Sequence, residues 1–218
     1  MEQASSMEIA NLKNLPIGVF DSGVGGLTVA REIMRQIPNE RIVYFGDTAR
    51  VPYGSKSKET VTKYSRQIVR FLETQNVKAI VIACNTASAY ALEQIEKEIK
   101  VPIIGVVKPG AVTAARATQN GKVGVIATEG TIQSEIYTQY IKELKQDAKV
   151  IGKACPLFVP LVEEGLLEDP VTDEIAQRYL SVLIDSGILL SVACLASSAA
   201  SCFSYLFNVY PYPAFSLR

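Results

Sequence analysis

The sequence predicts an α/β fold made of two similar parallel-sheet domains that face each other across a cleft. Short apolar runs rich in Val and Ile alternate with longer segments in which apolar residues recur at helical spacing. The short runs are apolar throughout, which is typical of parallel strands covered on both faces. The same alternation restarts near residue 107, so each half of the chain is expected to form its own sheet.

Residues 1–14 are expected to be a disordered leader, and residues 15–106 the N-terminal domain. Its first strand, at 16–20, runs into Asp21-Ser22 and a glycine-rich turn, and a helix is predicted over 27–37. Glycines in such a turn let a ligand approach the backbone closely. The turn lacks both the G-x-G-x-x-G spacing and a Walker lysine, so it does not favour a dinucleotide. Asp21 is equally explained as a helix cap.

A second strand is predicted at 41–45, followed by a loop that contains Pro52-Tyr53-Gly54. Ser55 or Ser57 is then expected to cap a long helix with a buried apolar stripe. The third strand, near 78–83, ends in Cys84-Asn85-Thr86, where another helix begins. Helix N-termini carry unpaired N–H groups and partial positive charge, which favour a thiolate, and Asn85 and Thr86 are good capping types. Taken alone, Cys84 is better explained as a buried structural thiol beside a polar cap.

These three polar turns share one property, which is that each follows the end of a strand. Ligands of parallel sheets bind beyond the carboxyl ends of the strands. We therefore expect Asp21-Ser22, Pro52-Tyr53-Gly54 and Cys84-Asn85-Thr86 to converge on one crevice. That expectation favours a functional role for Cys84.

Residues 107–187 are predicted to form the second α/β domain. Helices are expected at 108–118 and 132–145, and strands at 122–128 and 150–155. A last helix begins at Asp169-Pro170, and Gly187 closes it as a C-cap. Thr128 and Thr131 would present hydroxyls from this half of the chain.

Composition limits the chemistry further. The 22 basic and 22 acidic residues form no basic stripe, so nucleic acid is not an expected partner. The absence of histidine excludes Ser-His and Cys-His catalysis and any imidazole metal site, and no metal is expected. The four cysteines match neither a zinc ribbon nor a disulfide scaffold, and the amino terminus does not resemble a signal peptide. We expect free thiols and a cytoplasmic location.

The motifs closely resemble those of bacterial glutamate racemases, in the cofactor-independent aspartate/glutamate racemase family. They are Asp21-Ser22-Gly-Val-Gly-Gly, Pro52-Tyr53-Gly54, Cys84-Asn85-Thr86 and Ala127-Thr128-Glu-Gly-Thr131, in this order. The resemblance runs from about Leu15 to Gly187. It implies two α/β domains with the active site between them and interconversion of L- and D-glutamate, with no cofactor. It also implies that D-glutamate is supplied for peptidoglycan.

By this resemblance, Cys84 is one of two catalytic cysteines. Asp21, Ser22, Tyr53, Gly54, Asn85 and Thr86 would bind substrate or orient the thiol, and Thr128 and Thr131 would assist from the second domain. Racemisation removes the α-proton from one face and returns a proton to the other, so a thiolate and a thiol must stand on opposite sides of Cα. Asp21 would either assist the Cys84 proton or receive the ammonium group. The resemblance allows a homodimer, and a membrane partner is not expected.

The chain departs from the family pattern after Gly187. The family's final strands and helix, which return to the first domain, have no counterpart in the sequence, so the second domain and the C-terminal return are expected to be incomplete. The family's second cysteine lies in a Gly-Cys-Thr-His-Tyr-Pro motif, whereas Cys194 here is followed by Leu195-Ala196-Ser197, and no charged residue occurs between 186 and 217. Three explanations of the 188–218 tail stay open: a shifted reading frame or chimeric gene, an apolar membrane segment over 188–209, or a divergent terminus that packs. Cys194 is a candidate for the second thiol, whereas Cys155 is expected to be structural and Cys202 has no supporting context.

Two functions therefore compete. The chain is either a glutamate racemase that uses Cys84 as one acid/base group, or a truncated relative that binds glutamate without racemising it.

Overall fold

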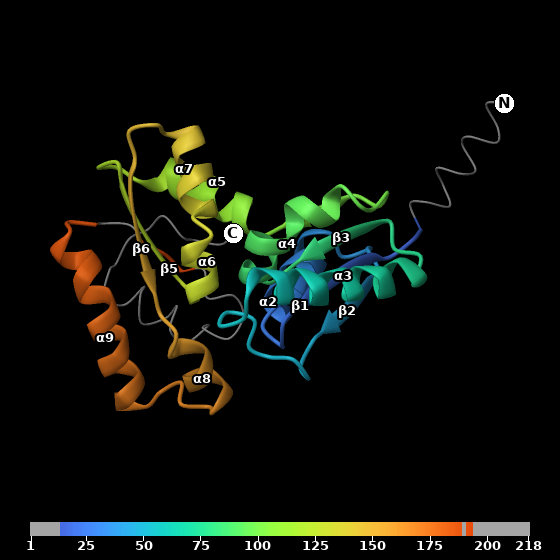
Figure 1. The fold of residues 1–218 in the computed structure, drawn as a ribbon, viewed down its shortest axis with the longest axis horizontal. Coiled ribbons are helices and arrows are strands. Elements are labelled where there is room, and N and C mark those ends of the chain that lie inside the picture. Colours follow the sequence, from blue (N-terminus) through green and yellow to red (C-terminus); the bar gives the residue numbers. More distant parts are fainter. Residues whose placement is uncertain (1–13, 189–190, 194–218) are drawn as a thin grey trace. The chain divides into compact units, whose positions relative to one another are not determined.

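The computed structural model describes residues 14–188 and 191–193 (Figure 1). The predicted leader up to residue 13, Cys194, Cys202 and the tail from 194 onward lie outside the described residues. The chain divides into two compact units between Val106 and Val107.

The first unit is built on a four-stranded parallel sheet with the strand order β2-β1-β3-β4. The strands are β1 (Ile17–Asp21), β2 (Ile42–Gly46), β3 (Ala79–Ile82) and β4 (Ile103–Gly105). The connecting helices are α2 (Leu27–Gln36), α3 (Lys58–Thr74) and α4 (Asn85–Glu96). Each strand runs into the helix or loop that follows from the same edge of the sheet, as the alternating sequence pattern predicts.

Side chains of β1 alternate between two apolar layers because successive strand residues point to opposite faces. On one face Val19 packs with Ala30 of α2 and with Ala83. On the other face Phe20 belongs to the larger core that also contains residues of α3 and α4. One helix therefore covers one face of the sheet and two helices cover the other.

The second unit has a three-stranded parallel sheet with the order β6-β5-β7. The strands are β5 (Lys122–Ala127), β6 (Lys149–Ala154) and β7 (Ser191–Ala193), and the helices are α5 (Val107–Ala117), α6 (Glu129–Gln133), α7 (Ile136–Leu144), α8 (Phe158–Glu163) and α9 (Pro170–Asp185). Its core joins Ile126 and Cys155 to Phe158 of α8 and Leu180 of α9. The predicted α/β class with parallel sheets is confirmed.

One predicted helix is wrong in its extent. The sequence pattern indicated a single helix over 132–145, but the structure has α6 and α7 with a break at Ser134 and Glu135. Glu135 has a left-handed backbone with φ of 54°, which a continuing helix cannot contain. The Ser134 hydroxyl donates a 2.7 Å hydrogen bond to the Thr131 carbonyl and accepts one from the Ile136 N–H, so it stabilises the break locally.

Local signals fix the helix ends as the sequence indicated. Ser57, rather than Ser55, caps α3 by accepting the Thr60 N–H. Asp169 caps α9, and Gly187 follows it with φ of 67°.

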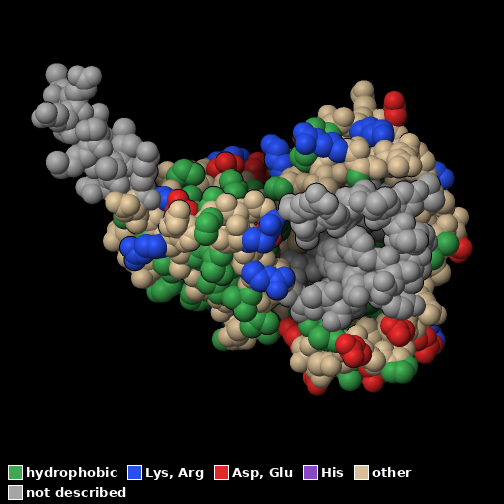
Figure 2. Space-filling view, turned by 180° about the vertical axis from the view of Figure 1, so that it is seen from behind, with side chains coloured by type: hydrophobic (Ala, Val, Ile, Leu, Met, Phe, Trp, Pro, Cys, Tyr) green, Lys and Arg blue, Asp and Glu red, His purple; other side chains and the backbone are tan. Residues whose placement is uncertain are grey.

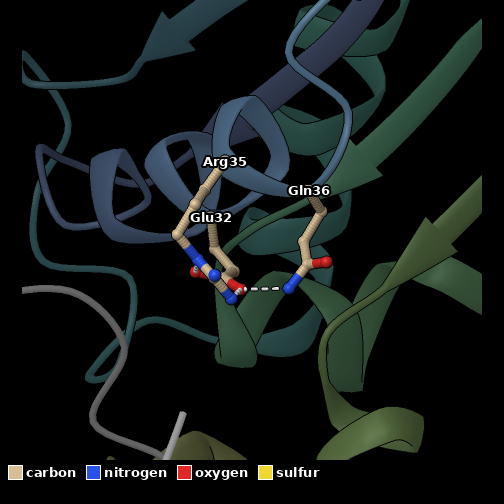
Figure 3. A network of polar contacts seen from close by, with 3 residues as sticks. All are labelled: Glu32, Arg35 and Gln36. Atoms are coloured by element: carbon tan, nitrogen blue, oxygen red, sulfur yellow. Dashed lines mark hydrogen bonds and ion pairs between the residues drawn. The ribbon is translucent and has the colours of Figure 1, made fainter. Parts of the chain in front are cut away.

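Polar side chains on exposed helix faces interact at i,i+3 and i,i+4 spacing. On α2, Glu32 accepts hydrogen bonds from both Arg35 and Gln36 (Figure 3). On the face shown in Figure 2, both units carry basic and acidic side chains. No helix within residues 14–188 is long and apolar enough to cross a membrane.

Candidate active site

Cys84 occupies the junction between β3 and α4. The Ala83 N–H donates to the Phe20 carbonyl at 2.7 Å, which extends the pairing of β3 with β1 by one residue. Cys84 then becomes the N-cap of α4, and its Sγ accepts the Ala87 N–H at 3.4 Å. Asn85 and Thr86 were expected to cap this helix, but they lie in its first turn, where both are buried. The cap is therefore the thiol itself.

Ser22 and Cys84 meet although 62 residues separate them in the chain. The Cys84 thiol donates to the Ser22 hydroxyl over 3.4 Å. Their contact follows from the topology, because β1 and β3 are neighbours in the sheet and both residues follow the ends of these strands. Two of the three predicted turns are thus brought together.

Asp21 organises the glycine-rich turn from inside it. Its side chain is buried, and Oδ2 accepts the N–H groups of Gly23 at 3.3 Å and Gly26 at 2.9 Å. These bonds close the turn between β1 and α2, so Asp21 does the work of a cap even though Gly26 occupies the N-cap position. The carboxylate is held next to the thiol site by the main chain.

Electrostatics at Cys84 favour the protonated thiol. Burial and, to a smaller extent, the nearby Asp21 carboxylate raise the pKa of Cys84 to about 12, although the hydrogen bonds with Ser22 and Ala87 act in the opposite direction. The sequence argument that a helix N-terminus favours a thiolate was incomplete, because desolvation outweighs the helix terminus here. At neutral pH the group is a proton donor, and once deprotonated it is a strong base.

Two substitutions are expected to move the pKa of Cys84 in opposite directions. Asp21→Asn removes a negative charge and should lower it, whereas Ser22→Ala removes a hydrogen-bond partner of the thiolate and should raise it. The measurement is the pH dependence of alkylation of Cys84, followed by mass spectrometry of its peptide. In the unsubstituted chain the rate should keep rising above about pH 10.5, where an ordinary thiol with a pKa of about 8.5 has already reached its plateau. A shift in the same direction for both variants would contradict the assignment.

The third predicted turn lies on the loop between β2 and α3. Its Tyr53 side chain is buried and donates a short hydrogen bond to the carboxylate of Asp47, the first residue after β2. The Asp47 N–H in turn donates to the Asp21 carbonyl at 3.0 Å, which joins the end of β2 to the end of β1. Burial, then the hydrogen bond and charge of Asp47, raise the pKa of Tyr53 far above its usual value, and Cys84 contributes a smaller electrostatic effect. Gly54 follows Tyr53 and is half-buried.

Sequence reasoning missed three residues of this region. Tyr44 of β2 donates to the Gly23 carbonyl at 3.3 Å, and burial, Asp21 and Cys84 together raise the pKa of Tyr44. Asp47 and Arg50 form a partly buried ion pair on the loop. Asp47 directly follows a strand, which is the signal that could have singled it out.

In the second unit, Thr128 and Thr131 lie together at the end of β5. Thr128 caps the short helix α6 by accepting the Thr131 N–H at 3.4 Å, and the two hydroxyls are 3.1 Å apart. Cys155 follows β6 and is completely buried in the core, where burial raises its pKa to about 12. Within the described residues, no group of three or more His, Cys, Asp or Glu side chains could hold a metal ion.

These features define a parallel-sheet α/β protein that presents a buried thiol, a hydroxyl and a carboxylate at the carboxyl edge of its first sheet. A family model described as Asp/Glu/Hydantoin racemase matches residues 17–189 of the chain. The chain belongs to this family, which confirms the resemblance that the motifs indicated.

Individual relatives are glutamate racemases. The chain is 54% identical to that of Geobacter metallireducens over 172 residues, which cover 79% of this chain and 64% of the relative's length. The crystal structure of a glutamate racemase isoform from Bacillus anthracis superposes with a TM-score of 0.86 at 41% identity, over 90% of this chain and 73% of the other. A Francisella tularensis glutamate racemase in complex with D-glutamate gives a TM-score of 0.85 at 38% identity, over 93% and 77% of the two chains.

Proposed function

We propose that this chain is a glutamate racemase that interconverts L- and D-glutamate, with Cys84 as one of its two acid/base groups. The observation that carries the proposal is the contact of the buried Cys84 thiol with Ser22 at the sheet edge, in a chain about half identical to glutamate racemases. The product D-glutamate would supply peptidoglycan synthesis. A cytoplasmic location and a homodimer stay predictions.

The proposed chemistry is a proton exchange at Cα. A thiolate takes the α-proton and becomes a thiol, and the electron pair of the C–H bond remains on the substrate, delocalised into the α-carboxylate. A second acid then gives a proton to the opposite face and becomes a base. Each turnover leaves the two groups in exchanged protonation states, and the reverse direction restores them.

The geometry supports distinct roles for the residues around Cys84. The first turn of α4, with Asn85 and Thr86, is a suitable place for donors that stabilise the negative charge developing on the substrate carboxylate. Asp21 is proposed to receive the α-ammonium group, because a cation there would offset the negative charge that raises the pKa of Cys84. The main chain of the Tyr53-Gly54 segment, on the loop after β2, is proposed to bind substrate.

The opposite acid/base group is not assigned among the described residues. Cys155 is buried in the apolar core of the second unit, and its Sγ lies 3.5 Å from the carbonyl oxygen of Lys153. Cys194 stays a candidate by sequence alone. Thr128 and Thr131 are proposed to assist from the second unit.

The function is tested by α-proton exchange in deuterated water, measured separately with L- and D-glutamate. A racemase should exchange the α-proton of both enantiomers and convert each into the other. Exchange of one enantiomer without conversion would show that only one acid/base group works, and it would contradict the racemase proposal. Absence of exchange with both, in a chain shown to be folded by circular dichroism, would overturn the proposal.

A further inference from the structure

The loop between β2 and α3 is held by one buried carboxylate. The Asp47 side chain is only 5% exposed, and both of its oxygens are engaged by Arg50, with Nε 2.9 Å from Oδ1 and 2.8 Å from Oδ2. Oδ2 also accepts the hydroxyl of Tyr53. A buried carboxylate without such donors would be strongly destabilising, so these contacts are needed to keep it in place.

The two donors to Asp47 are themselves anchored on α3. The Arg50 guanidinium lies 4.3 Å from the centroid of the Tyr64 ring, and its Nη1 donates to Gln67 at 2.6 Å. The Tyr53 ring packs against the same Tyr64 ring at 5.9 Å. The loop is therefore held between the end of β2 and the side of α3. Arg50 and Tyr53 both contact α3, and both donate hydrogen bonds to Asp47.

This arrangement decides what the Tyr53 side chain can do. Its hydroxyl donates a hydrogen bond to the Asp47 carboxylate, and its ring is buried against the Tyr64 ring. The phenol is thus an anchor for the chain at Tyr53-Gly54 rather than a hydrogen-bond donor to a ligand. In addition, the Asp47 main-chain N–H donates a hydrogen bond to the carbonyl of Asp21, the residue next to Ser22.

We propose that Asp47 is a positioning residue of the candidate site, which acts through Tyr53 to hold the Tyr53-Gly54 segment in place at the carboxyl edge of the sheet. The part of the proposal that concerns substrate rests on the proposed racemase function, whereas the part that concerns the loop does not. Asp47 touches no reacting atom in this scheme. Its effect is to keep a binding segment in its productive position, where displacements of about 1 Å are costly.

The test compares Asp47→Asn with a matched control, Glu98→Gln. Both changes remove the carboxylate partner of an arginine, and Glu98 pairs bidentately with Arg66 of α3 on the surface of the same unit. In the full-length chain, hydrogen–deuterium exchange of peptides covering 47–57 should accelerate about tenfold or more in Asp47→Asn, since hydrogen bonds to charged groups contribute that much. Peptides covering 79–96, around Cys84, should be unchanged, and Glu98→Gln should alter neither region.

A double-substitution cycle separates positioning from a general loss of stability. If Asp47 acts through Tyr53, Tyr53→Phe should also accelerate exchange in 47–57, and adding it to Asp47→Asn should have little further effect. Additive effects, or equal acceleration throughout the first unit, would overturn the proposal. So would an unchanged loop in Asp47→Asn.

Kinetics with glutamate supply the second readout. In a chain that exchanges the α-proton, Asp47→Asn should lower kcat/KM about tenfold or more, while Glu98→Gln stays within about twofold. An unchanged kcat/KM in Asp47→Asn would overturn the link to substrate. If the unsubstituted chain exchanges neither enantiomer, the racemase proposal fails, and the deuterium measurements on the loop still decide whether Asp47 positions it.

Discussion

Replacing Cys84 with serine is expected to reduce α-proton exchange of glutamate by about 10²–10⁴-fold, the usual contribution of one acid/base group. A hydroxyl is a far weaker acid than a thiol, so serine cannot form the base that abstracts the α-proton. The fold should persist, because the serine oxygen can still accept the Ala87 N–H and serine is a preferred N-cap. The rate is measured by mass spectrometry of glutamate in deuterated water, and circular dichroism checks the fold.

Cys155→Ser is the matched control, since it makes the same atomic change at the chain's other described cysteine. Cys155 lies in an apolar core, so a hydroxyl there is expected to cost about 1–3 kcal/mol of folding free energy without changing the chemistry. Assays are run well below its unfolding temperature. Equal loss of exchange in both variants, with both folded, would argue against a specific role for Cys84.

Gly26→Ala is expected to lower the stability of the first unit. A Cβ at this position would lie 2.6 Å from the Cβ of Asp21 and 2.8 Å from that of Ala83, and neither atom can move without the main chain. Overpacking of this kind typically costs about 1–3 kcal/mol. For a unit of about 100 residues that corresponds to roughly 4–8 °C in Tm per kcal/mol. Thermal unfolding followed by circular dichroism provides the measurement.

Gly23→Ala in the same turn is the control for Gly26→Ala. Its added Cβ would meet only a terminal methyl of Val51 at 3.2 Å, and a side-chain methyl can yield by a few tenths of an ångström. A much smaller fall in Tm is expected. A fall as large as that of Gly26→Ala would mean that the whole turn resists any side chain, rather than one point of close approach.

The fold and the Ser22–Cys84 pair could be predicted because they depend on local patterns that share one topology. Apolar runs followed by helical spacing imply parallel strands, and parallel strands bring the residues after them to one edge. Neighbouring strands β1 and β3 then place Ser22 beside Cys84, as the structure shows.

Features that depend on contacts across the chain could not be predicted in this way. Arg50 and Asp47 look like ordinary loop charges, and only the packing of the loop against Tyr64 shows that the pair is partly buried. The protonated state of Cys84 depends on how completely its surroundings exclude water, which no spacing of residues encodes. The break between α6 and α7 depends on the left-handed conformation of Glu135, a residue that the helical pattern accommodates without conflict.

The candidate site residues of the first unit lie at or just after the carboxyl ends of its strands, and the turns that lead into the strands carry none of them. Gln75 and Asn76, which lead into β3, are exposed and sit at the amino end of a strand whose other end delivers Cys84. The unit therefore has one edge that carries the candidate site and an opposite edge whose exposed turns lie at the other end of the strands. Insertions or tags are best placed at the second edge, where they lengthen an exposed turn and leave Cys84 in its position.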